Sequence, residues 1–274
     1  MATHLLIRCG ELFLKGKNYP LFERKVVANL QKISAVSKIT CLRGRFIVPY
    51  FEDHHSIRRV FGLTSYSPAI EVERDMDAIK KAALLLLAGK TGTFKIEPKR
   101  SDKSFPLTSP EINIELGRFI EKNPPLRFDG NAYDFLVGVE INHKGAYLFT
   151  EVIPCCGGLP TGVEGSVALL VHNEASILAG LLMMKRGVDI FPVSFDQRDI
   201  SLLQRFSPSP LSLKVLHHIT DLEEYARQRK ISILTTGETL TERLPEKYPF
   251  LRLHPLIAYD SAAISQQLAK FKSV

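Results

Sequence analysis

The chain has 274 residues, of which 45% are hydrophobic and 24% are charged, and it carries a formal net charge of +7. A chain of this length and hydrophobic content can form the cores of two or three small domains. Its longest apolar stretches, around residues 82–88 and 175–184, are shorter than the roughly 18 residues of a membrane span. A membrane protein is thereby excluded, and a short apolar start interrupted by Arg8 predicts no signal peptide and hence a cytoplasmic location.

Residues 1–50 contain nine basic and two acidic side chains, so they account for the whole net charge. Such asymmetry indicates a domain that faces a polyanion, although a solvated basic face explains the charge alone equally well. The apolar patterns predict a strand, a helix, two paired strands that turn at Arg43-Gly44, and a second helix, which is a ferredoxin-like layout. The expected ranges are 4–9, 19–33, 39–41, 45–50 and 56–61.

The next region predicts a second α/β domain, in which a strand and a helix are followed by a strand, a helix and a hairpin. Ser109 is the expected cap of the second helix. The loop before it concentrates Lys99, Arg100 and Lys103, which suit the phosphate oxygens of a nucleic acid. A solvated loop would have the same composition. The expected ranges are 64–72, 76–87, 93–98, 109–122, 133–141 and 146–152.

Residues 154–160, Pro-Cys-Cys-Gly-Gly-Leu-Pro, form the clearest linker in the chain. The strands and helices that alternate after it predict a small, doubly wound parallel sheet. Their expected ranges are 166–171, a helix ending at Gly187, 188–195, a polar stretch at 196–210, a helix at 211–228, and 231–235. The predicted fold class is therefore α/β, and the predicted parts are a ferredoxin-like domain at 1–58, a second α/β domain at 59–153, a linker at 154–165 and the parallel-sheet domain at 166–274.

The turn after the first strand of that sheet, residues 171–176, reads Val-His-Asn-Glu-Ala-Ser. In open α/β sheets such a turn binds nucleotide phosphates, because helix amides are free there and glycines allow close approach. This turn has no glycine, while Asn173 predicts an N-cap and Glu174 places a carboxylate in the first helical turn. The frame of a nucleotide site is kept without its phosphate-binding chemistry. His172 and Glu174 could form an acid–base pair, but a structural histidine is the favoured interpretation.

The four cysteines have no C-x-x-C pair and no metal-type spacing with histidine, which predicts neither a disulfide framework nor a metal site. Cys155 and Cys156 are neighbours in the glycine-rich linker and could act as redox groups. A reactive thiol needs nearby positive charge or a helix terminus. Because the sequence around them indicates neither, a structural role is favoured.

Segments with the character of motifs occur along nearly the whole chain. They are residues 8–18, which include Lys15 and Lys17, and residues 60–69, 99–109, Gly158-Leu159-Pro160 with Gly162 and Gly165, 182–187, Thr236-Gly237-Glu238 and 254–260. Together they resemble the tRNA 4-thiouridine synthetase family, whose members join an N-terminal ferredoxin-like domain, a THUMP RNA-binding domain and an adenylating PP-loop domain. Residues 8–18 differ from the family's opening motif at Cys9, where the family has tyrosine. The resemblance implies the same three-part fold.

The departures from the family fall on the parts that bind ATP. The family's Ser-Gly-Gly-x-Asp-Ser loop aligns with residues 171–176, where only Ser176 is kept. Both glycines and the aspartate that organises the metal–nucleotide complex are replaced. The family's Gly-Gln-x-x-Ser-Gln-Thr segment is likewise replaced at residues 239–245, and no catalytic cysteine or rhodanese extension is recognised before Val274. We therefore expect no cofactor.

The resemblance implies tRNA as the partner, and the basic N-terminal region supports it independently. We expect an RNA-binding scaffold or accessory subunit in tRNA modification. The alternatives are a divergent sulfurtransferase or adenylating enzyme that uses ATP and magnesium, and an RNA-binding subunit for a separate catalytic or sulfur-carrier protein. The resemblance also suggests a homodimer. The expected RNA contacts are Lys15, Lys17, Arg43, Arg45, Lys99, Arg100 and Lys103, and the altered nucleotide loop comprises His172, Asn173, Glu174, Ser176, Gly237 and Glu238.

Overall fold

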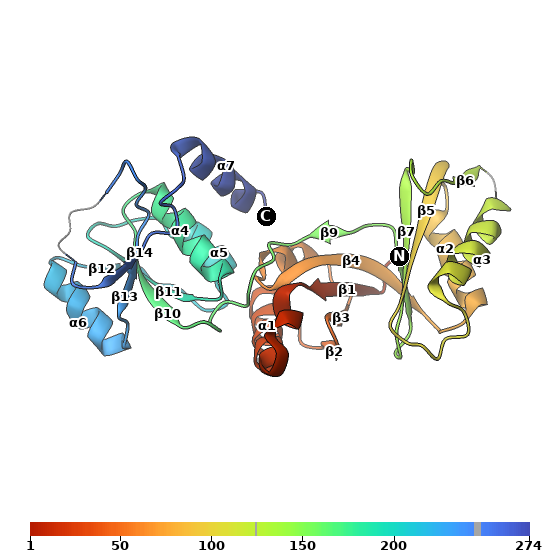
Figure 1. The fold of residues 1–274 in the computed structure, drawn as a ribbon, viewed down its shortest axis with the longest axis horizontal. Helices are drawn as coiled ribbons and strands as arrows, with labels where there is room; N and C mark the ends of the chain where they lie inside the picture. Colours follow the sequence, from red (N-terminus) through yellow and green to blue (C-terminus); the bar gives the residue numbers. More distant parts are fainter. Residues whose placement is uncertain (124, 244–247) are drawn as a thin grey trace. The chain divides into compact units, whose positions relative to one another are not determined.

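The computed structural model describes residues 1–123, 125–243 and 248–274, without the side chains of residues 11–14 (Figure 1). Leu244 and Pro245, which end the second segment that departs from the family pattern, lie outside the described residues. Within the described ranges, no helix is both long and apolar enough to cross a membrane.

The chain forms two compact units that interleave in the sequence. Segments of the N-terminal region belong to both units. This division by contacts does not test the domain boundaries predicted from the sequence, which stay a prediction. The first unit comprises residues 1–8, 38–52 and 65–153, and the second comprises residues 9–37, 53–64 and 154–274.

The strands of the N-terminal half join in one mixed sheet with the order β2-β3-β1-β4-β8-β7-β5-β6, and β9 pairs with β4. β5 runs parallel to β6 and β7, whereas β7 and β8 form an antiparallel hairpin. The predicted hairpin is therefore confirmed. The strands are β1 (His4–Cys9), β2 (Thr40–Leu42), β3 (Arg45–Pro49), β4 (Leu63–Val72), β5 (Gly92–Arg100), β6 (Leu126–Phe128), β7 (Phe135–Ile141), β8 (Ala146–Phe149) and β9 (Ile153–Pro154).

Helices α2 (Met76–Leu87) and α3 (Ser109–Glu121) pack on one face of this sheet in the first unit. Their apolar side chains form a core with Phe94 and Ile96 of β5. The predicted cap at Ser109 is wrong by one residue. Thr108 is the N-cap, because its amide donates to Glu111 Oε2 at 2.7 Å in a capping box.

The N-terminal segments of the second unit are helical. The 3₁₀ helix η1 (Glu11–Asn18) leads into α1 (Tyr19–Ser34), and Gly16 in η1 has a positive φ of 50° that favours glycine. The helix α1 buries Phe22, Val26 and Leu30, as the apolar spacing predicts. The helix expected at residues 56–61 is a 3₁₀ helix, η2 (His54–Arg59).

The segment predicted as a linker is held by hydrogen bonds within the second unit. The consecutive amides of residues 162–164 all donate to the carbonyl oxygen of Gly187, at 2.8 to 2.9 Å. In addition, Asn29 Nδ2 of α1 donates to the carbonyl oxygen of Thr161 at 3.0 Å. These glycine-rich residues therefore form a fixed bend beside α1 rather than a loose tether.

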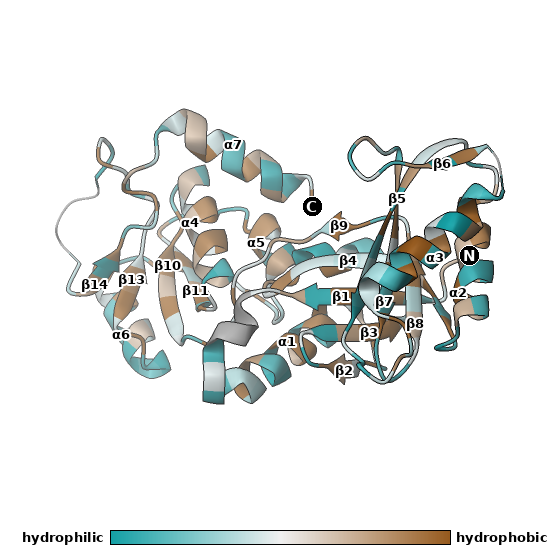
Figure 2. Cartoon of the chain, turned by 45° about the vertical axis from the view of Figure 1, so that its right-hand side comes forward, coloured by the Kyte–Doolittle hydropathy of each residue, from teal (hydrophilic) through white to brown (hydrophobic). Residues whose placement is uncertain are grey.

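The C-terminal part of the second unit contains the predicted parallel sheet, with the order β12-β11-β10-β13-β14. The helix α4 is apolar on all sides, as its largely brown colour in Figure 2 shows, because it packs between this sheet, α5 and α7. The elements are β10 (Ser166–Leu170), α4 (Glu174–Lys185), β11 (Asp189–Ser194), α5 (Ser201–Phe206), β12 (Lys214–Val215), α6 (Ile219–Arg229), β13 (Ile233–Thr235), β14 (Leu251–Leu253) and α7 (Ser261–Lys272).

The helix expected at residues 211–228 is wrong at its N-terminal end. The chain there is extended and includes β12, and α6 begins only at Ile219. Asp221 fixes this start, because its carboxylate accepts hydrogen bonds from the amides of His217 and His218 at 2.8 and 2.9 Å. The polar stretch expected at residues 196–210 contains the short helix α5.

Candidate functional site

The turn between β10 and α4 is closed by its own side chains. Asn173 is the N-cap of α4, as predicted, and its Oδ1 accepts a hydrogen bond from the Ser176 amide at 3.0 Å. The fully buried Ser176 hydroxyl lies 2.9 Å from His172 Nδ1 and 3.0 Å from Asn173 Oδ1. An amide that such helix termini offer to anions is therefore already hydrogen-bonded within the protein.

Glu174 does not pair with His172. Its carboxylate is exposed and lies 3.2 Å from Lys272 Nζ of α7. Burial lowers the pKa of His172, and the charge of Arg198 adds to this, against a hydrogen bond with Leu170 and the charges of Glu238 and Glu242. A histidine with a lowered pKa and a serine partner fits a structural role better than an acid–base pair with Glu174.

Residues 236–238 lie directly against this turn. A Cβ atom added to Gly237 would lie 2.5 Å from the Ser176 amide nitrogen, so only glycine fits here without a shift. Glu238 is 3% exposed, and its Oε2 accepts a hydrogen bond from Thr236 Oγ1 at 2.6 Å. The structure thus brings together the altered-loop residues that the sequence predicts, with the exception of the exposed Glu174.

Two basic residues of β14 and the segment after it complete the surroundings of Glu238. His254 Nδ1 lies 3.2 Å from Glu238 Oε2, and Arg252 Nη1 lies 3.6 Å from Glu238 Oε1. Neither Arg252 nor His254 is among the residues that the sequence predicts for this site. Their spacing by two residues, at the end of a short strand, is the signal that could have found the pair.

The cap of α4 gives a first testable prediction. Asn173→Ala removes the acceptor of the Ser176 amide, so we expect the free energy of unfolding to fall by about 1 kcal/mol in urea denaturation. Asn18→Ala is the matched control, because Asn18 caps α1 without a side-chain hydrogen bond to the helix. Equal losses in the two variants would contradict the assigned cap.

The basic residues predicted for the loop before α3 have different surroundings, because Lys99 and Arg100 end the strand β5 and Lys103 lies in the loop after it. Lys99 is about half exposed, with its Nζ 2.9 Å from Glu97 Oε1, and Lys103 is exposed. Arg100 Nη1 donates to the carbonyl oxygens of Phe105 and Leu107 at 2.8 and 2.9 Å. Lys99 and Lys103 can therefore meet a ligand, whereas Arg100 shapes the loop that follows β5.

Arg45 is part of an internal ionic cluster in the first unit. Glu140 is 7% exposed and accepts hydrogen bonds from Arg8 Nε and Arg45 Nε, both at 2.8 Å. Burial on its own would raise the pKa of Glu140, but the charges of Arg8 and Arg45 outweigh it and lower that pKa. Arg45 is thus engaged within the protein, while Arg43, at the neighbouring turn, is exposed.

The basic pair of the N-terminal loop belongs to the second unit. Lys17 is exposed. Lys15 Nζ lies 3.4 Å from Glu164 Oε1 and 4.5 Å from the ring centroid of Phe22. Lys15 is therefore engaged by its neighbours, and Lys17 is the more accessible of the two.

The neighbouring cysteines of the linker are poor nucleophiles. Burial raises the pKa of the Cys155 thiol to about 12, with a contribution from Cys156 that outweighs the opposing charge of Arg58. Burial also raises the pKa of Cys156, against the charges of Lys185 and Arg58. Across the described ranges, no group of three or more His, Cys, Asp and Glu side chains could hold a metal ion.

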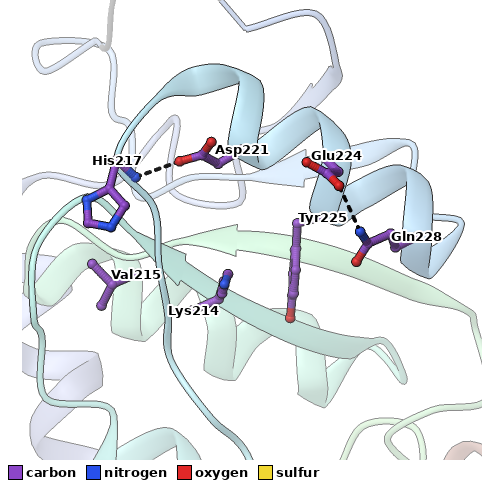
Figure 3. A pocket seen from close by; sticks show the side chains of 7 residues that line it. All are labelled: Lys214, Val215, His217, Asp221, Glu224, Tyr225 and Gln228. Atoms are coloured by element: carbon purple, nitrogen blue, oxygen red, sulfur yellow. Dashed lines mark hydrogen bonds between the residues drawn. The ribbon is translucent and has the colours of Figure 1, made fainter.

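A cavity of about 500 Å³ that the sequence did not indicate lies beside β12 and α6. Figure 3 shows its lining, in which Lys214 belongs to β12, His217 to the segment after it, and Asp221 and Glu224 to α6. Glu224 Oε1 accepts a hydrogen bond from Gln228 Nε2 at 3.1 Å. The acidic and basic groups are mixed, so the cavity has no clear preference for an anion or a cation.

Two family models match the chain: the ThiI ferredoxin-like domain at residues 4–67 and the THUMP domain at residues 73–151. A probable tRNA sulfurtransferase of Thermotoga maritima is 31% identical in an alignment that covers 95% of this chain and 71% of that protein. The chain belongs to the tRNA sulfurtransferase family. A Moorella thermoacetica family member is 40% identical over 71% of this chain.

This tRNA sulfurtransferase family member spans about half to two thirds of several relatives, with 53% coverage of the Moorella protein and 63% of one from Natranaerobius thermophilus. Two solved structures share its fold. A Pyrococcus horikoshii protein superposes with a TM-score of 0.87 at 29% identity, covering 98% of this chain and 99% of its own. A 4-thiouridine synthetase crystallised with RNA and bound ATP superposes with a TM-score of 0.84 at 26% identity, covering 99% and 85%.

Proposed function

We propose that this chain binds tRNA and that its parallel-sheet region is a scaffold that does not adenylate RNA. The observation that carries the proposal is the turn at residues 172–176. It lacks glycine, and its Ser176 amide is capped by Asn173. Both features argue against a triphosphate, since glycines would allow its close approach and free amides would bind its phosphates.

The RNA-binding half of the proposal rests on the THUMP match, on the RNA-bound relative and on the exposed basic residues. Arg43, Lys99, Lys103 and Lys17 are accessible to a phosphate backbone. We leave Arg45 out of the interface, because its guanidinium is engaged by Glu140. Contacts of this kind position RNA without reading its sequence.

A filter-binding assay with tRNA tests this half. In the double variant Lys99→Ala/Lys103→Ala we expect about a tenfold loss of affinity at moderate salt, and a log–log salt slope reduced by about two, because two phosphate contacts are lost. Arg100 is kept so that the loop keeps its shape. The control Lys81→Ala/Lys122→Ala removes two exposed lysines of α2 and the end of α3. Equal affinities in the two double variants would remove the loop from the interface.

A second candidate is a divergent adenylating or sulfur-transferring enzyme with a remodelled ATP–magnesium site. Its support is the retained Thr236-Gly237-Glu238 segment, which still packs on the altered turn. Calorimetric titration with ATP and magnesium separates the candidates. The scaffold proposal expects no saturable heat, whereas micromolar binding that is abolished by Ser176→Ala or Glu238→Gln would overturn it.

A scaffold in tRNA modification acts with other proteins, so we extend the proposal to a separate catalytic or sulfur-carrier subunit and to a homodimer. Recovery of a PP-loop or sulfur-carrier protein with the tagged chain would support the first. Light scattering at several concentrations tests the second, and a monomer mass throughout would rule out the homodimer.

A further inference from the structure

The strand β5 presents a second set of basic residues that face away from the helices. Its side chains alternate, so that Phe94 and Ile96 are buried against α2 and α3. Lys95, Glu97 and Lys99 consequently share the opposite face of the sheet. Lys99, one of the RNA contacts proposed above, therefore lies on this face.

The neighbouring strand extends this face. In the register of β5 and β7, Lys95 lies beside Leu136 and Lys99 beside Glu140. The carboxylate of Glu140 is matched by the two guanidinium groups of Arg8 and Arg45. This cluster is internal, since Arg8 and Glu140 are 8% and 7% exposed, whereas Lys95 of β5 is partly exposed and Lys99 is exposed.

An exposed aromatic ring lies at the other end of β5. Tyr133 is 43% exposed, and Lys95 Nζ lies 5.3 Å from its ring centroid. The loop that carries Tyr133 is anchored to β5, because the Asp134 amide donates to the Thr93 carbonyl oxygen at 2.9 Å and Asp134 Oδ2 accepts from the Thr93 amide at 2.8 Å. The backbone next to the ring is thus fixed to β5.

We propose that Tyr133 and Lys95 form a binding site for an unpaired RNA nucleotide, whose base stacks on the tyrosine ring while the lysine contacts its phosphate. An exposed ring next to a cation is the arrangement by which proteins hold single-stranded nucleic acid without reading its sequence. This inference rests on the proposed function, since it assigns to the RNA-binding protein a contact for single-stranded RNA beside its contacts to the phosphate backbone.

The test compares a short single-stranded RNA carrying 2-aminopurine with a blunt, fully paired hairpin. Tyr133→Ala should weaken binding of the single strand about tenfold and abolish its fluorescence quenching, while Tyr133→Phe keeps both. Lys95→Ala should weaken binding and lower the salt slope by about 0.7, the value for one single-strand phosphate. The matched control Lys81→Ala lies on α2 and should bind like the unmodified protein.

Unchanged binding of the single strand by Tyr133→Ala would overturn the site, and so would equal weakening for the single strand and the hairpin. If Lys99→Ala/Lys103→Ala weakens tRNA binding while Tyr133→Ala has no effect on either probe, the nucleotide site fails alone. If the unmodified protein binds no tRNA but quenches the single-strand probe through Tyr133, the proposed function fails and the site stands. Circular dichroism of Tyr133→Ala should match the unmodified protein, because Tyr133 lies outside the buried core of the first unit.

Discussion

Glu140→Gln should lower the free energy of unfolding by about 3 kcal/mol at neutral pH, because it leaves the buried guanidinium of Arg8 without its counter-charge. The side chains of Arg8 and Glu140 are 10% and 9% exposed, so water cannot replace the lost partner. Glutamine keeps the volume of the side chain, and the loss therefore reports the charge. Urea denaturation followed by circular dichroism measures it.

The pH dependence of the same variant has a defined sign. The pKa of Glu140 is lowered in the folded protein, since Arg8 and Arg45 outweigh the effect of burial. Its stabilising contribution is therefore present above the ordinary carboxyl pKa and is lost as the pH falls through the lowered folded value. Stability measured between neutral and acidic pH should fall less steeply in Glu140→Gln than in the unmodified protein.

Glu97→Gln is the control for this experiment. Glu97 lies on the same face of β5 and pairs with Lys99, but both side chains are about half exposed. Exposed pairs contribute little, so we expect a change within about 0.5 kcal/mol. If the two variants lost the same stability, the cluster around Glu140 would be no more than a surface ion pair.

The regular elements follow closely from the sequence where the apolar pattern is local. Residues 76–87 form α2 with the predicted bounds, and the alternation after residue 166 produces the predicted parallel sheet. In both cases the signal lies within one element, since the buried side chains recur at the period of a helix or fill a buried strand. The helix predicted at residues 211–228 is wrong at its start, because the apolar pattern alone does not fix where a helix begins. The apolar residues of this segment suit a helix, but the cap at Asp221 decides its first residue.

The site was predictable in part. The altered turn could be placed because Asn173 and Ser176 act on neighbours within a few residues. The ionic cluster could not, since Arg8 and Glu140 are separated by 132 positions and meet only through the order of the strands. For that reason the sequence predicts Arg45 as an RNA contact. Nothing in its local sequence indicates the carboxylate that engages it.

Gly237→Ala should destabilise the second unit by about 1 to 3 kcal/mol, the usual cost of overpacking. The added methyl group would meet backbone atoms of Ala175 and Ser176, at 2.7 and 2.5 Å, and backbone cannot rotate away as a side chain can. To relieve this contact, the turn at the start of α4 must move. Urea denaturation measures the overall loss, and Gly130→Ala is the control, because its nearest neighbour would lie at 3.9 Å.

The titration of His172 shows whether the damage is local to the turn. Burial is the main cause of its lowered pKa, so a turn pushed open by Gly237→Ala should let that pKa rise toward the ordinary histidine value in an NMR titration. A lowered folded pKa also means that this histidine costs stability as the pH falls through the ordinary histidine range, and the variant should lose that dependence. An unchanged His172 titration together with unchanged stability in Gly237→Ala would mean that the turn accommodates a methyl group without moving. The close packing that argues against a triphosphate would then be absent, and the enzyme alternative would gain.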